Sequence, residues 1–176
     1  MKKPIVVIPA VTPKNKNLDK FGGWDWMDIS KTAWKYWCDK NGYELVIYDK
    51  CKLDDLNKYR VTVQRWFDIH DFLDEKNIEY SKVLMVDACS IPHWDCPDLF
   101  ELTGDNMCVS HDIDNMRWTY ESAQGYKKIF NNFELDMSKY INSGWVIFNE
   151  SHRDLFKKFK DFYLQNSDEF IKLQTK

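Results

Sequence analysis

The chain has 176 residues, enough for one domain with a substantial core and too few for two. Its 28 acidic and 25 basic side chains give a formal net charge of −3, which argues against a general nucleic-acid-binding protein. No apolar run approaches the roughly 20 residues of a membrane-spanning helix. The five cysteines are odd in number and irregularly spaced, which favours reduced thiols and a cytoplasmic location.

The first half of the chain alternates apolar runs with helical patterns. Residues 5–8 and 43–48 read as buried strands, and residues 25–40 between them carry apolar side chains at helical spacing. A strand, a helix and a second strand in this order predict a right-handed crossover and a parallel pair. A second helix is predicted over residues 58–76.

Each of these helices is expected to bury one apolar stripe. In the first helix the stripe comprises Trp26, Ile29, Ala33 and Trp37. In the second it comprises Val63, Trp66, Phe67, His70 and Leu73. We interpret His70 as a residue at the edge of the core. Arg60 and Arg65 lie off that stripe, where an arginine either reaches a pyrophosphate or is solvated.

A third strand, Val83 to Val86, ends at a carboxylate. Asp87 follows the apolar run directly, and burying a carboxylate there is costly unless it meets a metal, a donor or water. Open α/β sheets bind ligands at the carboxyl ends of their strands, so Asp87 is a binding candidate. The alternative is that Asp87 only caps the next turn. Pro92 and Pro97 predict an irregular segment before a short helical turn at residues 98–102.

The second half contains two more strands and a helix. Residues 106–111 read as a strand with Asp112 and Asp114 at its end, and residues 145–148 form a buried run. Residues 115–138 show no clean period, which is typical of a binding loop. An amphipathic helix is predicted over residues 152–164, with Leu155, Phe156, Phe159, Phe162 and Tyr163 inward, followed by a polar tail that frays.

Three segments together resemble a known family. They are the strand that ends at Asp87, the proline-containing step into Asp98-Leu-Phe, and the later Asn-Ser-Gly-x-x-x-Phe-Asn of residues 142–149. This order is similar to that of the nucleotide-diphospho-sugar transferases of the GT-A fold, especially galactosyl- and glucosyltransferase-like members. The resemblance implies one α/β, Rossmann-like domain over residues 1–176, with a mostly parallel sheet flanked by helices and without the family's usual C-terminal segment.

The same resemblance implies a glycosyltransferase that moves a sugar from a UDP- or GDP-sugar donor to a glycan or another hydroxyl acceptor. Asp87 would stand first in the family's Asp-x-Asp motif, which meets the ribose and a Mn²⁺ or Mg²⁺ ion. Asp112 and Asp114 are the candidates for the catalytic carboxylate. The residues expected to bind the nucleotide-sugar are Pro9, Ala10, Val11, Thr12, Arg65, Asp87, Ala88 and Cys89. Those expected to line the sugar or acceptor pocket are Asn142, Ser143 and Gly144.

One departure from the family's motif leaves alternatives open. Cys89 stands where the family has the second Asp, and a thiol is a poor ligand for hard ions such as Mn²⁺ and Mg²⁺. Asp112-Ile-Asp114 is a literal Asp-x-Asp and offers a substitute in space. A non-catalytic nucleotide-sugar- or glycan-binding module with a degenerate motif is a second reading. A third is a Zn²⁺ site made by Cys89, His93, Cys96, Cys108 and His111.

Overall fold

The computed structural model describes residues 2–11, 25–56, 58–111, 116–127, 129–131, 134 and 136–174. These residues contain a five-stranded sheet in the order β2-β1-β3-β5-β4. The strands are β1 (Ile5–Pro9), β2 (Glu44–Tyr48), β3 (Val83–Val86), β4 (Cys108–His111) and β5 (Ile141–Phe148).

The sheet is mixed because one strand runs against the others. β1 pairs in parallel with both β2 and β3, whereas β5 is antiparallel to β3 and to β4. Four strands therefore share one direction, and the predicted α/β, Rossmann-like class is confirmed. The parallel pairing of β1 with β2 follows from the crossover through α1 (Asp25–Asn41), as predicted.

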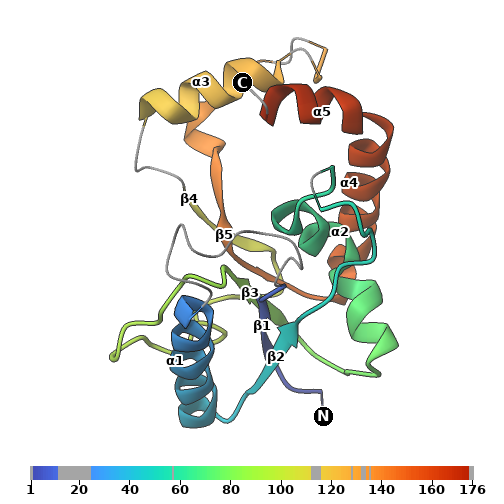
Figure 1. The fold of residues 1–176 in the computed structure, drawn as a ribbon. Helices are drawn as coiled ribbons and strands as arrows, with labels where there is room; N and C mark the ends of the chain where they lie inside the picture. The colour runs from blue at the N-terminus through green and yellow to red at the C-terminus, as the bar shows by residue number, and fades with distance from the viewer. Residues whose placement is uncertain are drawn as a thin grey trace.

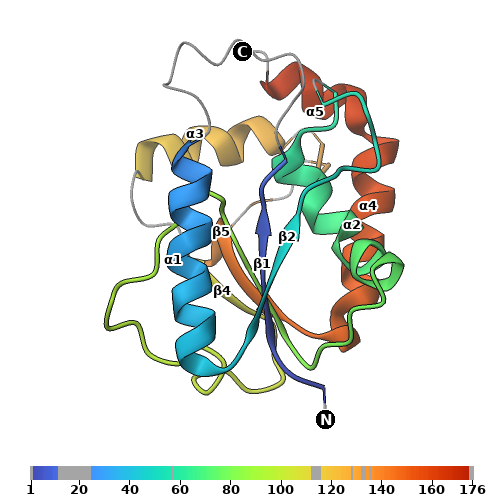
Figure 2. The same ribbon diagram turned by 60° about the horizontal axis from the view of Figure 1, so that its bottom comes forward.

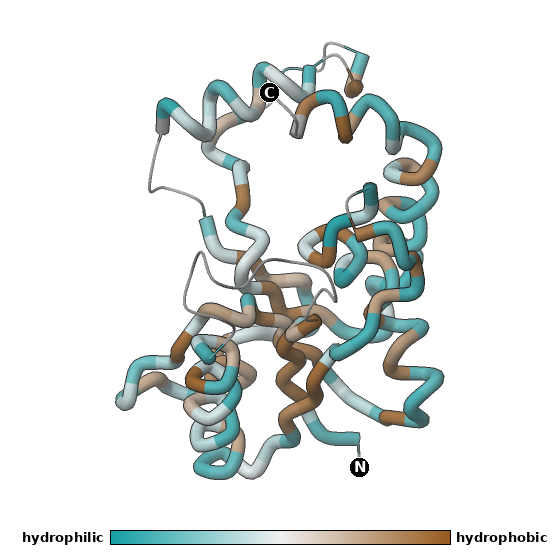
Figure 3. The backbone as a smooth tube through the Cα atoms, in the orientation of Figure 1, coloured by the Kyte–Doolittle hydropathy of each residue, from teal (hydrophilic) through white to brown (hydrophobic). Residues whose placement is uncertain are grey.

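Helices cover both faces of the sheet (Figures 1 and 2). Val6 and Ile8 of β1 point toward α1, while Ile5 and Val7 point toward α2 (Val61–Glu75) and α4 (Arg153–Gln165). Both faces are therefore apolar, and the brown central strands in Figure 3 show this. Short 3₁₀ turns, η2 (Met137–Lys139) and η3 (Glu150–His152), flank β5.

Two helices were not predicted. Residues 115–138 were expected to be irregular and the residues after Gln165 to fray, yet the chain forms α3 (Met116–Tyr126) and α5 (Ser167–Gln174). The rings of Tyr126 and Phe170 lie 6.0 Å apart, and the two helices lie together in Figure 1. The residues that α3 buries include Thr119 and Ala123, whose side chains are small.

The buried faces of α1 and α4 also differ from the prediction. In α1, Ile29 is 58% exposed, because the buried face is the neighbouring one. The hydroxyl of Ser30 within that face donates to the carbonyl of Ser90 at 2.6 Å, a polar contact that an apolar pattern cannot reveal. In α4, Leu155 is half exposed while Phe156 and Tyr163 are buried. The buried side chains of α1 are Met27, Ser30, Trp34, Trp37 and Cys38.

Among the described residues, no helix combines the length and the apolar character that a bilayer span requires.

The described residues form a sheet with α1 on one face and α2 with α4 on the other. The carboxyl edge of its parallel strands lies next to the segments that carry most of the predicted site residues.

Candidate functional site

Asp87 stands where the sequence places it, directly after the fully buried strand β3. Its backbone N–H donates to the carbonyl of Gly144 at 2.8 Å, which continues the β3–β5 pairing by one residue. Its side chain is 38% exposed. The register that pairs Val7 with Met85 brings Pro9 to the level of Asp87 at this edge.

Arg65 of α2 is the partner of Asp87. Its Nη1 contacts Oδ1 of Asp87, and its Nη2 donates to the carbonyl of Ser143 at 2.8 Å. The apolar stripe of the second helix had placed Arg65 outside the buried face. In the structure Arg65 is only 3% exposed, so its side chain belongs to the buried face of α2. A buried charge is costly unless it is paired and hydrogen-bonded. Asp87 pairs this one and the carbonyl of Ser143 accepts from Nη2, while the buried Nε has no hydrogen-bond partner among the described residues.

A β-bulge makes the carbonyl of Ser143 available to Arg65. The pairing of β4 with β5 shifts register between Val109, which faces Val146, and Ser110, which faces Asn142. Residues 143–145 are therefore the extra residues on β5 at this point. Bulges redirect backbone groups and are frequent beside functional sites.

Gly144 leaves no space for a side chain. A Cβ at this position would lie 2.5 Å from Oδ2 of Asp87 and 2.8 Å from Oδ1 of Asn142. The Asn142 side chain folds back and accepts from the N–H of Gly144 at 2.7 Å. The close approach explains the glycine, and it brings together the three predicted pocket residues and Asp87.

The turn after Asp87 is held by α1. The N–H and the hydroxyl of Ser90 both donate to the carbonyl of Asp87, at 2.9 and 2.6 Å. Ser30 and the indole N–H of Trp34 in turn donate to Ser90. This turn buries Ala88 and exposes Cys89. Sequence reasoning missed Ser30 and Trp34 as positioning residues, although their separation by four places puts them on one face of the helix.

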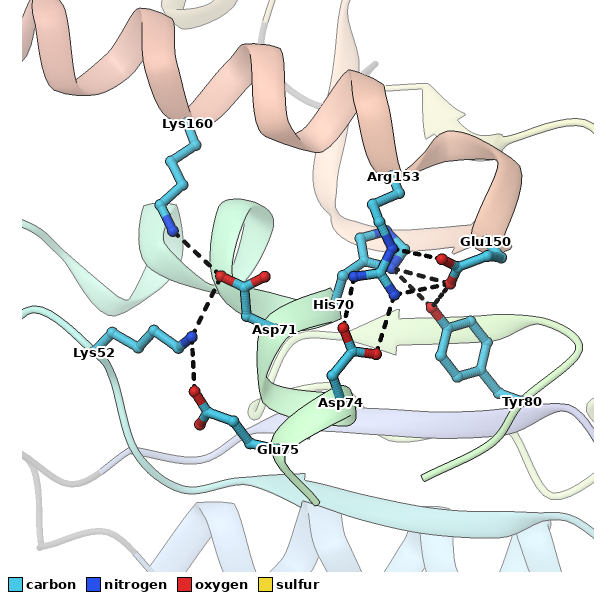
Figure 4. A network of polar contacts seen from close by, with 9 residues as sticks. All are labelled: Lys52, His70, Asp71, Asp74, Glu75, Tyr80, Glu150, Arg153 and Lys160. Atoms are coloured by element: carbon cyan, nitrogen blue, oxygen red, sulfur yellow. Dashed lines mark hydrogen bonds and ion pairs between the residues drawn. The ribbon is translucent and has the colours of Figure 1, made fainter. Parts of the chain in front are cut away.

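A polar network holds α2 against η3 and α4 (Figure 4). Both ends of the Arg153 guanidinium bond Asp74, at 2.8 and 3.1 Å, and the same side chain reaches Glu150. The hydroxyl of Tyr80 donates to Glu150 at 2.7 Å and lies 2.8 Å from Nδ1 of His70. Burial lowers the pKa of His70 to about 4, so its ring is neutral at physiological pH. Arg65 therefore projects from a helix whose C-terminal half is held by this network.

The other predicted site residues are less favourably placed or lie elsewhere. Pro9 and Val11 are buried, and Val11 belongs to the core. The N–H of Ala10 donates to the carbonyl of Tyr48 at 2.9 Å. Thr12, Asp112 and Asp114 lie outside the described residues.

The predicted Zn²⁺ site is wrong. Its five proposed ligands, which all lie within the described residues, are Cys89, His93, Cys96, Cys108 and His111. Within the described ranges, no three His, Cys, Asp or Glu side chains come together as metal ligands, and all five cysteines are free.

Asp87 and Cys89 do not form a preformed Mn²⁺ or Mg²⁺ site either. Asp87 supplies one carboxylate whose Oδ1 is already paired with Arg65, and Cys89 adds a thiol, whereas hard cations require several oxygens.

Comparisons with known proteins find a likeness among solved structures. Neither a protein-family model nor a curated protein sequence matches the chain. A solved crystal structure of a glycosyltransferase involved in the glycosylation of the major capsid of PBCV-1 superposes with a TM-score of 0.54 at 11% sequence identity. The match covers 93% of this chain and 67% of the other. A likeness at this identity shows a shared fold.

Proposed function

We propose that this protein transfers a sugar from a UDP- or GDP-sugar donor to a hydroxyl group of a glycan or another acceptor. The observation that carries the proposal is the arrangement of Asp87 at the carboxyl edge of β3, paired with buried Arg65 and packed against Gly144. Open α/β sheets bind ligands at this edge. The fold shared with a solved glycosyltransferase supports the same reading.

The reaction forms a bond between the acceptor oxygen and the anomeric carbon and breaks the bond from that carbon to the diphosphate. In our proposal Asp87, with Ala88 and Cys89, orients the donor, and Arg65 keeps Asp87 in one rotamer so that the site is preorganised. Asn142, Ser143 and Gly144 line the sugar. The acceptor proton passes to a carboxylate, for which we propose Asp112 or Asp114. The nucleoside diphosphate leaves.

We propose that a Mn²⁺ or Mg²⁺ cofactor, where the reaction uses one, binds together with the donor and not before it. Mg²⁺ is often bound by one or two carboxylates together with substrate phosphates. Asp87 offers one such carboxylate, so any hard cation would depend on the phosphates of the donor. Donor binding measured with and without Mn²⁺ tests this dependence directly.

A second candidate is a binding module that holds a nucleotide-sugar without turnover. The observation that favours it is the loss of the motif's second carboxylate at Cys89, while Oδ1 of Asp87 is engaged by Arg65. Release of nucleoside diphosphate separates the two candidates. Binding of a UDP- or GDP-sugar with no release at any Mn²⁺ concentration would support the module.

The first experiment is a thermal-shift panel of UDP-, GDP- and CMP-sugars, with and without Mn²⁺. A ligand of the native state raises the apparent stability. We expect a UDP- or GDP-sugar to raise Tm in the wild type and not in Asp87→Asn. We choose Asn because Ala would leave the Arg65 guanidinium buried without its side-chain partner. Asp95→Asn, which changes an exposed carboxylate in the same loop, is the matched control. Equal shifts in all three proteins would remove Asp87 from the site.

We also propose a reducing, cytoplasmic setting for this activity. The support is chemical: none of the five cysteines forms a disulfide, and two of them, Cys38 and Cys51, are buried. Reduced thiols persist where glutathione and thioredoxin act. Alkylation of protein isolated without reductant should label five thiols after unfolding. Fewer labelled thiols would indicate an oxidising compartment.

A further inference from the structure

A hollow of about 400 Å³ lies between α2, α4 and the beginning of β5. Its lining includes Val63 and Trp66 from α2, Leu155 and Phe156 from α4, and Ile141 and Ser143 from β5. The rings of Trp66 and Phe156 stack on each other in this lining, with centroids 5.8 Å apart and planes 22° apart. None of the described residues that line it is charged.

The hollow adjoins the candidate site at Ser143. Ser143 lines the hollow, and its carbonyl accepts from Nη2 of Arg65 at 2.8 Å. Nη1 of the same guanidinium contacts Asp87. Trp66 follows Arg65 in the chain, so one turn of α2 contributes to both places. A molecule in the hollow is therefore one side chain away from the carboxylate assigned to the donor.

The chemistry of the lining excludes the donor's diphosphate and favours a neutral ring. A phosphate-bearing group needs charged or N–H partners, whereas the described lining is aliphatic and aromatic apart from Thr62 and Ser143. Small-molecule sites typically measure about 300–1,000 Å³ and combine apolar walls with few polar groups. A cavity of about 150 Å³ already admits benzene. The hollow has the size and the walls for an aromatic ring system.

We infer that this hollow binds an aromatic aglycone on the acceptor, which places the acceptor's hydroxyl groups beside Asp87. The inference rests on the proposed transferase function and adds the acceptor's chemical class to it. The acceptor is then a neutral molecule in which an aryl group is attached to the hydroxyl-bearing part. The apolar ring contributes binding free energy through buried area, and the hydroxyl-bearing part extends toward the bulge at Ser143.

The test compares two probes that differ only in the aglycone. Binding of 4-nitrophenyl glucoside and of methyl glucoside is measured by titration calorimetry, with no donor present. The aryl glucoside should bind measurably and the methyl glucoside at least about tenfold more weakly. Leu155→Gln should weaken aryl binding by about fivefold, because it makes one wall of the hollow polar. Leu164→Gln on the same helix, outside the hollow, should bind like the wild type.

The outcomes separate this inference from the proposed function. If the two glucosides bind equally, or Leu155→Gln binds the aryl probe as the wild type does, the inference is overturned even if a UDP-sugar raises Tm. If aryl binding depends on Leu155 but no nucleotide-sugar binds, the hollow is an aryl site and the transferase proposal fails. Urea unfolding of both Leu variants checks that the wall has changed and the fold has not.

Discussion

Gly144→Ala tests the close packing at the candidate site. The added Cβ would lie 2.5 Å from Oδ2 of Asp87 and 3.2 Å from its Cγ. Ordinary van der Waals contact begins at 3.4 Å, so the carboxylate must retreat by about 0.9 Å. A movement of that size stretches a hydrogen bond beyond its useful range, and the bond at risk joins Asp87 to buried Arg65.

We expect two measurable consequences. Overpacking a close contact costs about 1–3 kcal/mol of unfolding free energy, which for a chain of this size lowers Tm by roughly 2–12 °C. Donor binding should weaken by about tenfold or more, because Asp87 leaves its position. Urea unfolding and titration with the UDP- or GDP-sugar that gives the largest thermal shift provide the two readouts.

Gly104→Ala is the matched control, since a Cβ at residue 104 meets nothing within 4 Å. It should change neither stability nor binding beyond about 0.5 kcal/mol. If Gly144→Ala behaved like Gly104→Ala in both assays, the packing of Gly144 against Asp87 would contribute neither to the unfolding free energy nor to donor affinity. The assignment of the site would then lose its main geometric support.

Three further perturbations address the metal, the buried histidine and the buried aspartate. Cys89→Asp should raise Mn²⁺ affinity in the presence of UDP by about tenfold relative to Cys89→Ser, because it adds carboxylate oxygens beside Asp87. Equal Mn²⁺ affinities of the two variants by calorimetry would show that residue 89 does not face the metal. Burial lowers the pKa of His70 to about 4, so the unfolded chain takes up a proton at a pH where the folded chain does not. The contribution of His70 to stability is thus full above about pH 6.5 and declines by up to about 3 kcal/mol as the pH falls to about 4. His70→Gln should lessen that decline in urea unfolding curves, and an unchanged slope between pH 6.5 and 4 would contradict it. Burial raises the pKa of the Asp68 carboxyl, which is 1% exposed and has Nζ of Lys160 at 3.1 Å. Lys160→Met should therefore cost about 2–3 kcal/mol of unfolding free energy, and adding Asp68→Asn to that variant should recover part of the loss. Lys157→Met, which changes an exposed lysine, is the control. An equal loss of stability in Lys157→Met would refute the role of the Asp68–Lys160 pair.

Local patterns were sufficient for most of the sheet and for the helices that cover it. The apolar runs that became β1, β2 and β3 are short and sharply bounded, and α1, α2 and α4 begin and end within a few residues of their predicted limits. These signals are local because each element's boundary residues and apolar spacing belong to the element itself. The placement of Asp87 at the end of β3 follows from the same kind of signal.

Helices whose contacts come from elsewhere were not predictable in this way. The ring of Tyr126 in α3 lies against Phe170 in α5, more than forty places along the chain. The buried face of α1 was misassigned for a similar reason. Its Ser30 and Trp34 bond a turn sixty and fifty-six residues away, and polar contacts over such separations leave no trace in hydropathy.

The sequence by itself determined the succession of the five strands and of α1, α2 and α4, the carboxylate after β3 and the glycine step that enters β5. Only the tertiary structure decided that these features meet. Arg65 is 22 residues from Asp87 and 78 from Ser143, and it joins them because α2 packs on the sheet while a bulge in β5 turns one carbonyl toward it. Spacing along a chain reports what lies on one element, whereas the pairing of buried charges depends on how separate elements pack together.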